Sequence, residues 1–366
     1  FAALSLWPTA RAIASDIDPI AIEVAAENAA INRIGSSWTY ALLRAFTTVV
    51  SRDVSVQGVV NDMCEGRAVI YVDLLGYDEV SHHSGPERAD TLAVLRDLDR
   101  QLRRIERTCQ WTPRPYRIVV LSDHGQTQGA MFVDRAGETL AELVGRLCGG
   151  AASGDTDAEA GRTESTAWLR EARHEDGSTK TAAADAPTVL ASGALGLISF
   201  PGEPRRLTRE EIDARYPGLV DGLVNHPEIG FVLVRSAGGA SLVLGGSGSR
   251  NLQSGEVAGS DPLGPFGPDA VAQVSEVDGY RTTADLMVNS RYDPDLDEVA
   301  AFEHQVGSHG ALGGPQTHPF VLHPSDLSGP VEPVLGSPAV HRLLKGWLAD
   351  LGHPVTTPWR DAEARL

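Results

Sequence analysis

Two short apolar runs that each end in aspartate and histidine constrain the fold of this chain more than any other feature. The first run is Ala68–Val72, followed by the segment Asp73–Pro86, and the second is Arg117–Leu121, followed by Ser122–Gly129. A continuous apolar run is typical of a strand that is buried on both faces of a parallel sheet. Charged side chains are costly to bury at the end of such a strand unless they bind something there. The two segments therefore predict one functional site.

A helix is predicted between the two runs, and it determines how the two strands are connected. Ser84 and Glu87 have the spacing of a capping box, with Pro86 in the first turn, and the helix is expected to continue to about Cys109. A strand, a helix and a second strand form a β–α–β unit, in which the strands are parallel and end at the same sheet edge. We therefore expect the following residues to lie close together: Asp73, Asp78, His82, Asp123 and His124.

The remaining patterns predict an α/β fold with a mostly parallel sheet sandwiched by helices. Further helices are expected at 38–63, 138–147, from Thr208 to the interruption at Pro217, at 296–305 and from Ser337 to Leu351. Further strands are expected at Leu195–Phe200, Phe231–Arg235, Ala240–Leu244 and Asp285–Asn289, with a loop at 245–268. Residues 149–190 are rich in small and charged residues and are predicted to be a mobile insertion. The domain is expected to span 36–366, after an atypical N-terminal segment at 1–35.

The charge balance argues against a nucleic-acid partner. The chain has 31 Lys and Arg against 49 Asp and Glu, a formal charge of −18, and such a surface repels phosphate backbones. An acidic protein that handles phosphate esters needs cations to offset its own field, which agrees with a metal site. The sequence shows no uninterrupted apolar run of about 18 residues and no signal-peptide pattern. We therefore expect a soluble chain without a membrane-spanning helix of its own.

The aspartates and histidines are ligands suited to zinc. Asp78 and His82 have D-x-x-x-H spacing, Asp123 and His124 are adjacent, and His309 lies in the glycine-rich loop 307–314. Carboxylate oxygen and imidazole nitrogen suit zinc or a similar divalent ion with three or four protein ligands. Two such ions about 4 Å apart can clamp a phosphoryl group. His318 follows closely and is an alternative to His309 as a ligand.

Three segments together resemble the alkaline phosphatase superfamily, in particular its nucleotide pyrophosphatase/phosphodiesterase-like branch. They are VDLLGYDEVSHHSGP, LSDHGQTQG and GSHGALGG, and the resemblance runs from about residue 67 to 350. It implies an alkaline-phosphatase-like core that hydrolyses small phosphate mono- or diesters at a two-zinc site through a phospho-enzyme. The residues that it implies are Asp78, His82 and His309 for one zinc, and Asp123 and His124 for the second. Asp73, His83 and His318 are then candidates for supporting positions around the metal ligands.

The chain also resembles a bacterial, membrane-associated subgroup that is described as holin-like. In that subgroup the domain follows membrane-spanning helices, which implies a location at the cell envelope through segments outside this chain. In the family a Thr or Ser nucleophile and a further Asp ligand precede the D-x-x-x-H segment. Here Asp16 ends a strand-like run, while Thr47, Thr48 and Ser51 lie in a predicted helix. We therefore expect the nucleophile segment to be missing and the second zinc site to be incomplete, and no catalytic nucleophile is assigned.

Two alternatives to an active hydrolase follow from these residues. The first is a catalytically inactive metal-binding remnant that acts as a binding or structural module. The second concerns residues 12–34, which resemble the second strand and helix of Rossmann-type methyltransferases. The glycine-rich loop of those enzymes should lie upstream, but the first glycine of the chain is Gly35.

Overall fold

The computed structural model describes residues 46–150, 153–154 and 186–354. The chain divides into two compact units, which are treated separately here. The first comprises Phe1–Pro115 and His124–Pro319, and the second comprises Tyr116–Asp123 and Phe320–Leu366. The predicted segment 1–35, with Asp16 and the methyltransferase-like stretch, lies outside the described residues, as does most of the predicted insertion at 149–190.

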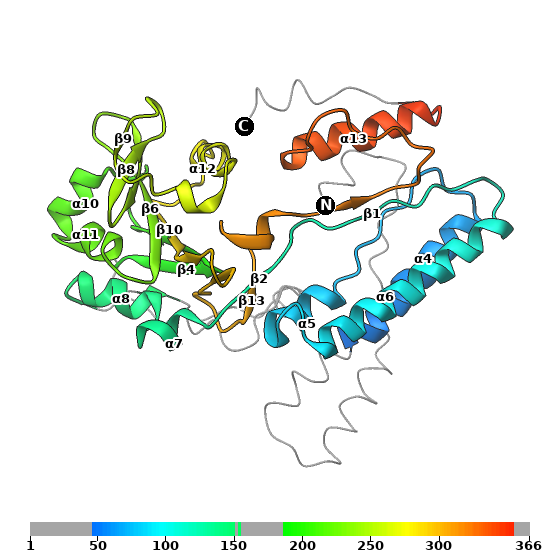
Figure 1. Ribbon diagram of the computed structural model, residues 1–366, viewed down its shortest axis with the longest axis horizontal. Coiled ribbons are helices and arrows are strands. Elements are labelled where there is room, and N and C mark those ends of the chain that lie inside the picture. Colours follow the sequence, from blue (N-terminus) through cyan, green and yellow to red (C-terminus); the bar gives the residue numbers. More distant parts are fainter. Residues whose placement is uncertain (1–45, 151–152, 155–185, 355–366) are drawn as a thin grey trace, which may run out of the picture. The chain divides into compact units, whose positions relative to one another are not determined.

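Helices dominate the first described part of the larger unit. They are the π-helical turn η1 (Phe46–Ser51), α4 (Arg52–Cys64), α5 (Gly76–Ser84), α6 (Ala89–Thr108) and the 3-10 turn η2 (Cys109–Trp111). Figure 1 shows α4 and α6 side by side. The Gln101 amide of α6 donates to the Asp53 carboxylate of α4 at 3.2 Å. The predicted helix at 38–63 is confirmed over its described part, and it ends before Gly66, whose φ of 74° suits glycine.

The prediction of a strand at Ala68–Val72 is wrong. The segment forms no strand with any described residue, and Tyr71 is 72% exposed. The run Arg117–Leu121 was expected to lie parallel to it in the same sheet. Only Val120 and Leu121 of that run form strand pairs, which are antiparallel and lie within the second unit. A strand needs a neighbouring strand whose backbone groups form hydrogen bonds with its own, and an apolar sequence does not by itself supply one.

The loop that was predicted between Asp73 and Pro86 contains a helix, α5. Gly85, with a φ of 96°, ends α5 and separates it from α6. The hydroxyl of Ser84 donates to the Asp90 carboxylate at 2.7 Å. Ser84 is the last residue of α5 and Arg88 is the N-cap residue of α6, so α6 begins at Ala89, later than the capping-box pattern predicts.

The largest described sheet has eight strands in the order β3-β4-β5-β10-β6-β7-β8-β9. The strands are β3 (Ser153–Gly154), β4 (Thr188–Ser192), β5 (Leu195–Ser199), β6 (Ile229–Arg235), β7 (Ser241–Gly245), β8 (Gly248–Asn251), β9 (Val257–Gly259) and β10 (Leu286–Ser290). Among these described strands, β3 and β4 pair in parallel and all other pairs are antiparallel.

The prediction of a mostly parallel sheet is therefore wrong, although the mixture of helices and sheets agrees with an α/β class. Several successive strands are joined by short turns, such as the one at Gly239 between β6 and β7. A short turn returns the chain antiparallel, whereas a parallel pair needs a long crossover. The predicted strands are confirmed as β5, β6, β7 and β10, while β8 and β9 lie in the predicted loop at 245–268.

Helices cover both faces of the eight-stranded sheet (Figure 1). One face packs against α8 (Leu140–Leu147), α10 (Arg209–Arg215) and α11 (Leu219–Val224), and the other packs against α12 (Ala270–Asp278). Alternation along β6 divides the strand between the two cores, since Val232 and Val234 face one core and Phe231 and Leu233 face the other. The helices predicted at 138–147 and from Thr208 are confirmed, and Thr208 forms its capping box with Glu211.

A smaller four-stranded sheet contains residues 127–128 and 307–308, which lie next in the chain to the segments with His124 and His309. It comprises β11 (Tyr292–Asp293), β12 (Glu298–Val299), β2 (Thr127–Gln128) and β13 (Gly307–Ser308), in that order. The helix predicted at 296–305 is wrong, because this segment contains β12. The backbone N–H of Phe302 donates to Gly193 and the carbonyl of Ala301 accepts from Phe132, so both groups bond outside their own segment.

The remaining short elements of the larger unit are α7 (Phe132–Ala136), η3 (Gly264–Phe266) and η4 (Gly314–Thr317).

In the second unit, β1 (Val120–Leu121) pairs antiparallel with β14 (Val321–Leu322). The final predicted helix is confirmed as α13 (Gly336–Asp350), whose Trp347 is buried and donates to Ser328 at 2.7 Å. In the described part of the chain, every helix is too short or too polar to cross a bilayer.

Candidate metal centre

Helix α5 places Asp78 and His82 on one of its faces, because residues four apart in a helix are neighbours. The Oδ2 atom of Asp78 lies 3.2 Å from Nε2 of His82. His82 is buried, and Asp78 is half-buried. The D-x-x-x-H spacing thus brings together a carboxylate and an imidazole, but it does so in a helix rather than in the predicted loop.

His309 joins this pair from the loop that follows β13. Its Nε2 lies 3.8 Å from Oδ1 of Asp78, and its ring centroid is 5.0 Å from that of His82. Each of the three residues offers a ligand atom, and all three atoms lie within 4.8 Å of one another. Segments more than two hundred residues apart in the sequence therefore form one compact cluster of metal-ligand type.

The backbone of β13 orients His82. Nδ1 of His82 donates to the carbonyl of Gly307 at 2.8 Å, and the N–H of Val306 donates to the His82 carbonyl at 2.9 Å. With its proton held on Nδ1, the neutral imidazole presents Nε2 toward Asp78. A backbone carbonyl on the far nitrogen is a usual way to fix the tautomer and direction of a metal-binding histidine.

Gln126 holds the carboxylate of Asp78 from the other side by donating from Nε2 to Oδ1. Burial opposes ionisation of Asp78, but the hydrogen bonds from His82 and Gln126 and the nearby imidazolium charges outweigh it and lower its pKa to about 2. Burial also disfavours protonation of His82, yet the bond and charge of Asp78 raise the net pKa of His82. Without metal, the two groups behave as an ion pair.

Acidification is expected to weaken metal binding, because His82 must lose its proton before Nε2 can act as a ligand. The pKa of His82 lies above its ordinary value of 6.5. Protons therefore begin to compete with the metal ion for His82 above pH 6.5, and they compete more strongly as the pH falls. Asp78 stays ionised throughout this range, with its pKa of about 2. Chelator competition across neutral and acidic pH should show zinc affinity falling at least about tenfold per pH unit below the His82 pKa. An affinity that stays constant across that range would exclude His82 as a ligand.

The loop that carries His309 is packed against the loop that carries Gln126. Strand β13 pairs antiparallel with β2, with Ser308 opposite Thr127. The hydroxyl of Thr127 donates to the carbonyl of Gly313 at 2.8 Å and accepts from the N–H of Gln316 at 3.0 Å. Thr127 and Gln316 are both buried. These bonds hold the glycine-rich loop in one conformation, which fixes the approach of His309 to α5.

The structure also brings His124 to the cluster. Its ring stacks on that of His309 with a centroid separation of 3.6 Å. Asp123, its neighbour in the sequence, belongs to the second unit. Of the supporting candidates, Asp73 and His318 are exposed, and the three-residue ligand cluster includes neither of them nor His83.

Sequence reasoning missed two parts of this arrangement. Gln126 donates to Asp78, a bond that the sequence patterns did not predict. Its place two residues after His124 in the same motif was the available signal. The orienting carbonyl of Gly307 could not be found from residue types, because every residue has a carbonyl group.

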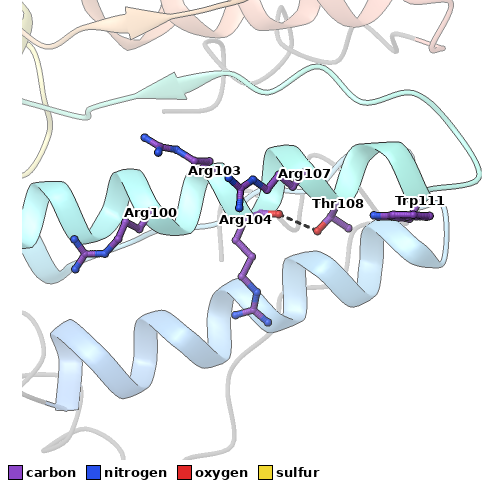
Figure 2. A pocket seen from close by; sticks show the side chains of 6 residues that line it. All are labelled: Arg100, Arg103, Arg104, Arg107, Thr108 and Trp111. Carbon is purple, nitrogen blue, oxygen red and sulfur yellow. Dashed lines mark hydrogen bonds between the residues drawn. The ribbon is translucent and has the colours of Figure 1, made fainter.

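A hollow of about 510 Å³ lies on α6, and none of the candidate ligands lines it. Figure 2 shows the side chains that line it. Its lining residues are Arg100, Arg103, Arg104, Arg107, Thr108 and Trp111. Three of the arginines already have neighbours: Arg100 pairs with Asp97, Arg103 with Asp99, and Arg104 points toward α4 and bonds to Gln57. The hollow is therefore the solvated face of α6, and the metal-ligand cluster remains the candidate site.

Comparison with known proteins gives one family. The family model described as type I phosphodiesterase/nucleotide pyrophosphatase matches residues 1–216, which is more than half of the chain, and the chain belongs to this family. The matched part includes Asp78, His82 and His124, whereas His309 lies beyond it. Neither the curated proteins nor the solved structures include a match. Membership supports phosphate-ester hydrolysis as the class of reaction.

Proposed function

We propose that this chain is a metal-dependent hydrolase of small phosphate esters whose first divalent ion is held by Asp78, His82 and His309. The observation that carries the proposal is the convergence of these three ligand atoms within 4.8 Å of one another. The family match supports the reaction class independently, because it rests on the sequence of residues 1–216 and not on the geometry of the cluster.

The donor set fits a divalent transition-metal ion. One carboxylate and two imidazoles are ligands that zinc takes in catalytic sites, where a fourth position stays open to water or substrate. When bound, such an ion polarises a phosphoryl oxygen and stabilises the charge that develops on it. Gln126 and the carbonyl of Gly307 hold Asp78 and His82 in place for that role.

We also propose that a second divalent ion is held by His124 and Asp123. The stacking of His124 on His309 supports this proposal, because it places a further imidazole next to the first three ligands. Zinc is the ion proposed at both positions. Small phosphate esters are the proposed substrates, and the net charge of −18 disfavours a nucleic-acid partner. The resemblance to membrane-associated relatives supports a proposed location at the cell envelope.

A metal-binding remnant without turnover is the second candidate function. It depends on whether a nucleophile is present, since the sequence offers no hydroxyl in the expected setting. Thr47, Thr48 and Ser51 lie in η1, and η1 contacts α5, the helix that carries Asp78. The hydrolase and the remnant differ in whether one of these residues acts as the nucleophile.

One experiment separates the two candidates. The purified chain is assayed for bound metal by mass spectrometry and for hydrolysis of a nitrophenyl phosphodiester. An active hydrolase contains zinc and turns over the ester, and the single replacements Thr47→Ala, Thr48→Ala and Ser51→Ala should identify which hydroxyl acts. Bound zinc without turnover would support the metal-binding remnant over the active hydrolase. Protein that holds no divalent metal after zinc loading would contradict both candidate functions.

A further inference from the structure

The turn between β4 and β5 lies directly against the backbone of His309. A Cβ atom placed on Gly193 would lie 2.0 Å from the carbonyl oxygen of His309, a distance that no side chain tolerates. In the opposite direction, a Cβ placed on Gly310 would lie 2.9 Å from Oγ of Ser192. The turn and the glycine-rich loop are therefore in close backbone contact from both sides, and glycine permits this approach at each point.

The turn is itself held rigidly by the segment that follows β12. The carboxylate of Glu303 accepts from the N–H of Gly193 at 2.5 Å, and the N–H of Phe302 donates to the carbonyl of Gly193 at 2.8 Å. The ring of Phe302 is buried against that of Phe132, with a centroid separation of 4.9 Å. The position of Gly193 is thus set by the core on one face of the eight-stranded sheet.

We propose that the β4–β5 turn, through Gly193 and Glu303, positions His309 as a metal ligand, so that the eight-stranded sheet sets the metal affinity of the site. The inference rests on the metal site proposed above. His309 follows β13 in a loop that contains Gly310, Gly313 and Gly314, and glycines give a loop little intrinsic preference for one conformation. The Thr127 bonds hold the far end of the loop, and packing against the turn adds a constraint at His309 itself, whose Nε2 lies 3.8 Å from Asp78. Glu303 and Gly193 are not among the three candidate ligands, and their role is to position His309.

Replacing Gly193 by alanine tests the contact. The added methyl group must displace the His309 carbonyl, and loss of a supporting contact around a metal ligand typically weakens metal binding about 10–100-fold. We expect Gly193→Ala to weaken Co²⁺ binding by that factor and to alter the visible absorption of the bound Co²⁺. Gly137→Ala is the matched control, because Gly137 also has a positive φ, 76° against 56° for Gly193, and no described atom lies within 4 Å of a Cβ placed on it. We expect the control to bind Co²⁺ within about twofold of the unaltered chain. Equal affinities for the two variants would overturn the inference.

Glu303 provides a second test that does not depend on how well Gly193→Ala folds. Glu303→Ala removes the acceptor for the Gly193 N–H and should weaken Co²⁺ binding at least about tenfold. Glutamine is as long as glutamate, and its amide oxygen can still accept from the Gly193 N–H. Glu303→Gln should therefore bind Co²⁺ to within about threefold of the unaltered chain. Thermal unfolding of both variants distinguishes a local effect from a loss of the fold. If Glu303→Gln binds Co²⁺ as poorly as Glu303→Ala, the turn does not act through this hydrogen bond.

The failure of this inference is distinguishable from the failure of the metal site itself. If the unaltered chain binds no Co²⁺, or if Asp78→Asn binds it as tightly as the unaltered chain, both the site and the positioning role are contradicted. If Asp78→Asn loses Co²⁺ while Gly193→Ala and Glu303→Ala both retain full affinity, the site stands and the positioning role alone is overturned.

Discussion

Replacing Asp78 by asparagine is expected to abolish tight metal binding and to reduce ester hydrolysis to background. Asparagine has the shape of aspartate but lacks the negative charge, and Asp78 is the only carboxylate in the described three-residue cluster. The carboxylate is held ionised, with a pKa of about 2, by His82 and Gln126, so the native site presents a full anionic ligand at neutral pH. We expect zinc affinity to fall more than about 100-fold, since loss of a supporting residue alone costs about 10–100-fold. Titration with a competing chelator measures this change.

Asp90→Asn is the matched control for that replacement. Asp90 is an exposed aspartate in the first turn of the neighbouring helix α6, where it accepts from Ser84. Its replacement removes the same charge from the same region of the chain and should leave zinc affinity within about twofold. If Asp78→Asn and Asp90→Asn bind zinc equally well, general electrostatics would account for metal binding, and the assignment of Asp78 as a ligand would be wrong.

Replacing Phe132 by alanine is expected to destabilise the larger unit by about 3–5 kcal/mol, the usual cost of emptying a phenylalanine site in a core. Phe132 is fully buried, and its ring lies 4.9 Å from that of Phe302 and 5.3 Å from that of His226. Its backbone N–H donates to Ala301 at 2.7 Å, so it also ties α7 to the segment that leads to Glu303. Urea unfolding that is followed by circular dichroism should show a midpoint shifted to lower urea.

The comparison for this prediction is Phe320→Ala. Phe320 is 56% exposed, and loss of an exposed side chain typically changes the free energy of unfolding by less than about 0.5 kcal/mol. A midpoint for Phe132→Ala that matches the midpoint for Phe320→Ala would show that the core formed by α7, α8 and the sheet does not contribute as the structure indicates.

The sequence pointed to three residues that the structure brings together, although the fold that supports them was not predicted. Asp78 and His82 were proposed from their D-x-x-x-H spacing, and His309 was proposed from its glycine-rich loop and the family resemblance. Their role as metal ligands stays a prediction. The strand predicted at Ala68–Val72 and the loop predicted after it were wrong. D-x-x-x-H brings two side chains together in a helix through the i, i+4 relation, so the site did not require the predicted sheet edge.

The sheet itself was predicted in its pieces but not in its direction. Local signals identified β5, β6, β7 and β10, and β6 and β7 pair across the short turn at Gly239. The antiparallel pairing of β10 with both β5 and β6 joins residues far apart in the sequence, and no local pattern encodes such a pairing. Strands β8 and β9 are short and consist mainly of small and polar residues, so they lack the apolar alternation by which strands are recognised.

The most direct test of the proposed site is a crystal structure of the zinc-loaded chain with anomalous scattering measured on both sides of the zinc absorption edge. The account predicts an anomalous peak bonded to a carboxylate oxygen of Asp78 and to the Nε2 atoms of His82 and His309, with the Nδ1 atom of His82 still bonded to Gly307. A zinc ion bound elsewhere, with these three side chains free of metal, would contradict the account.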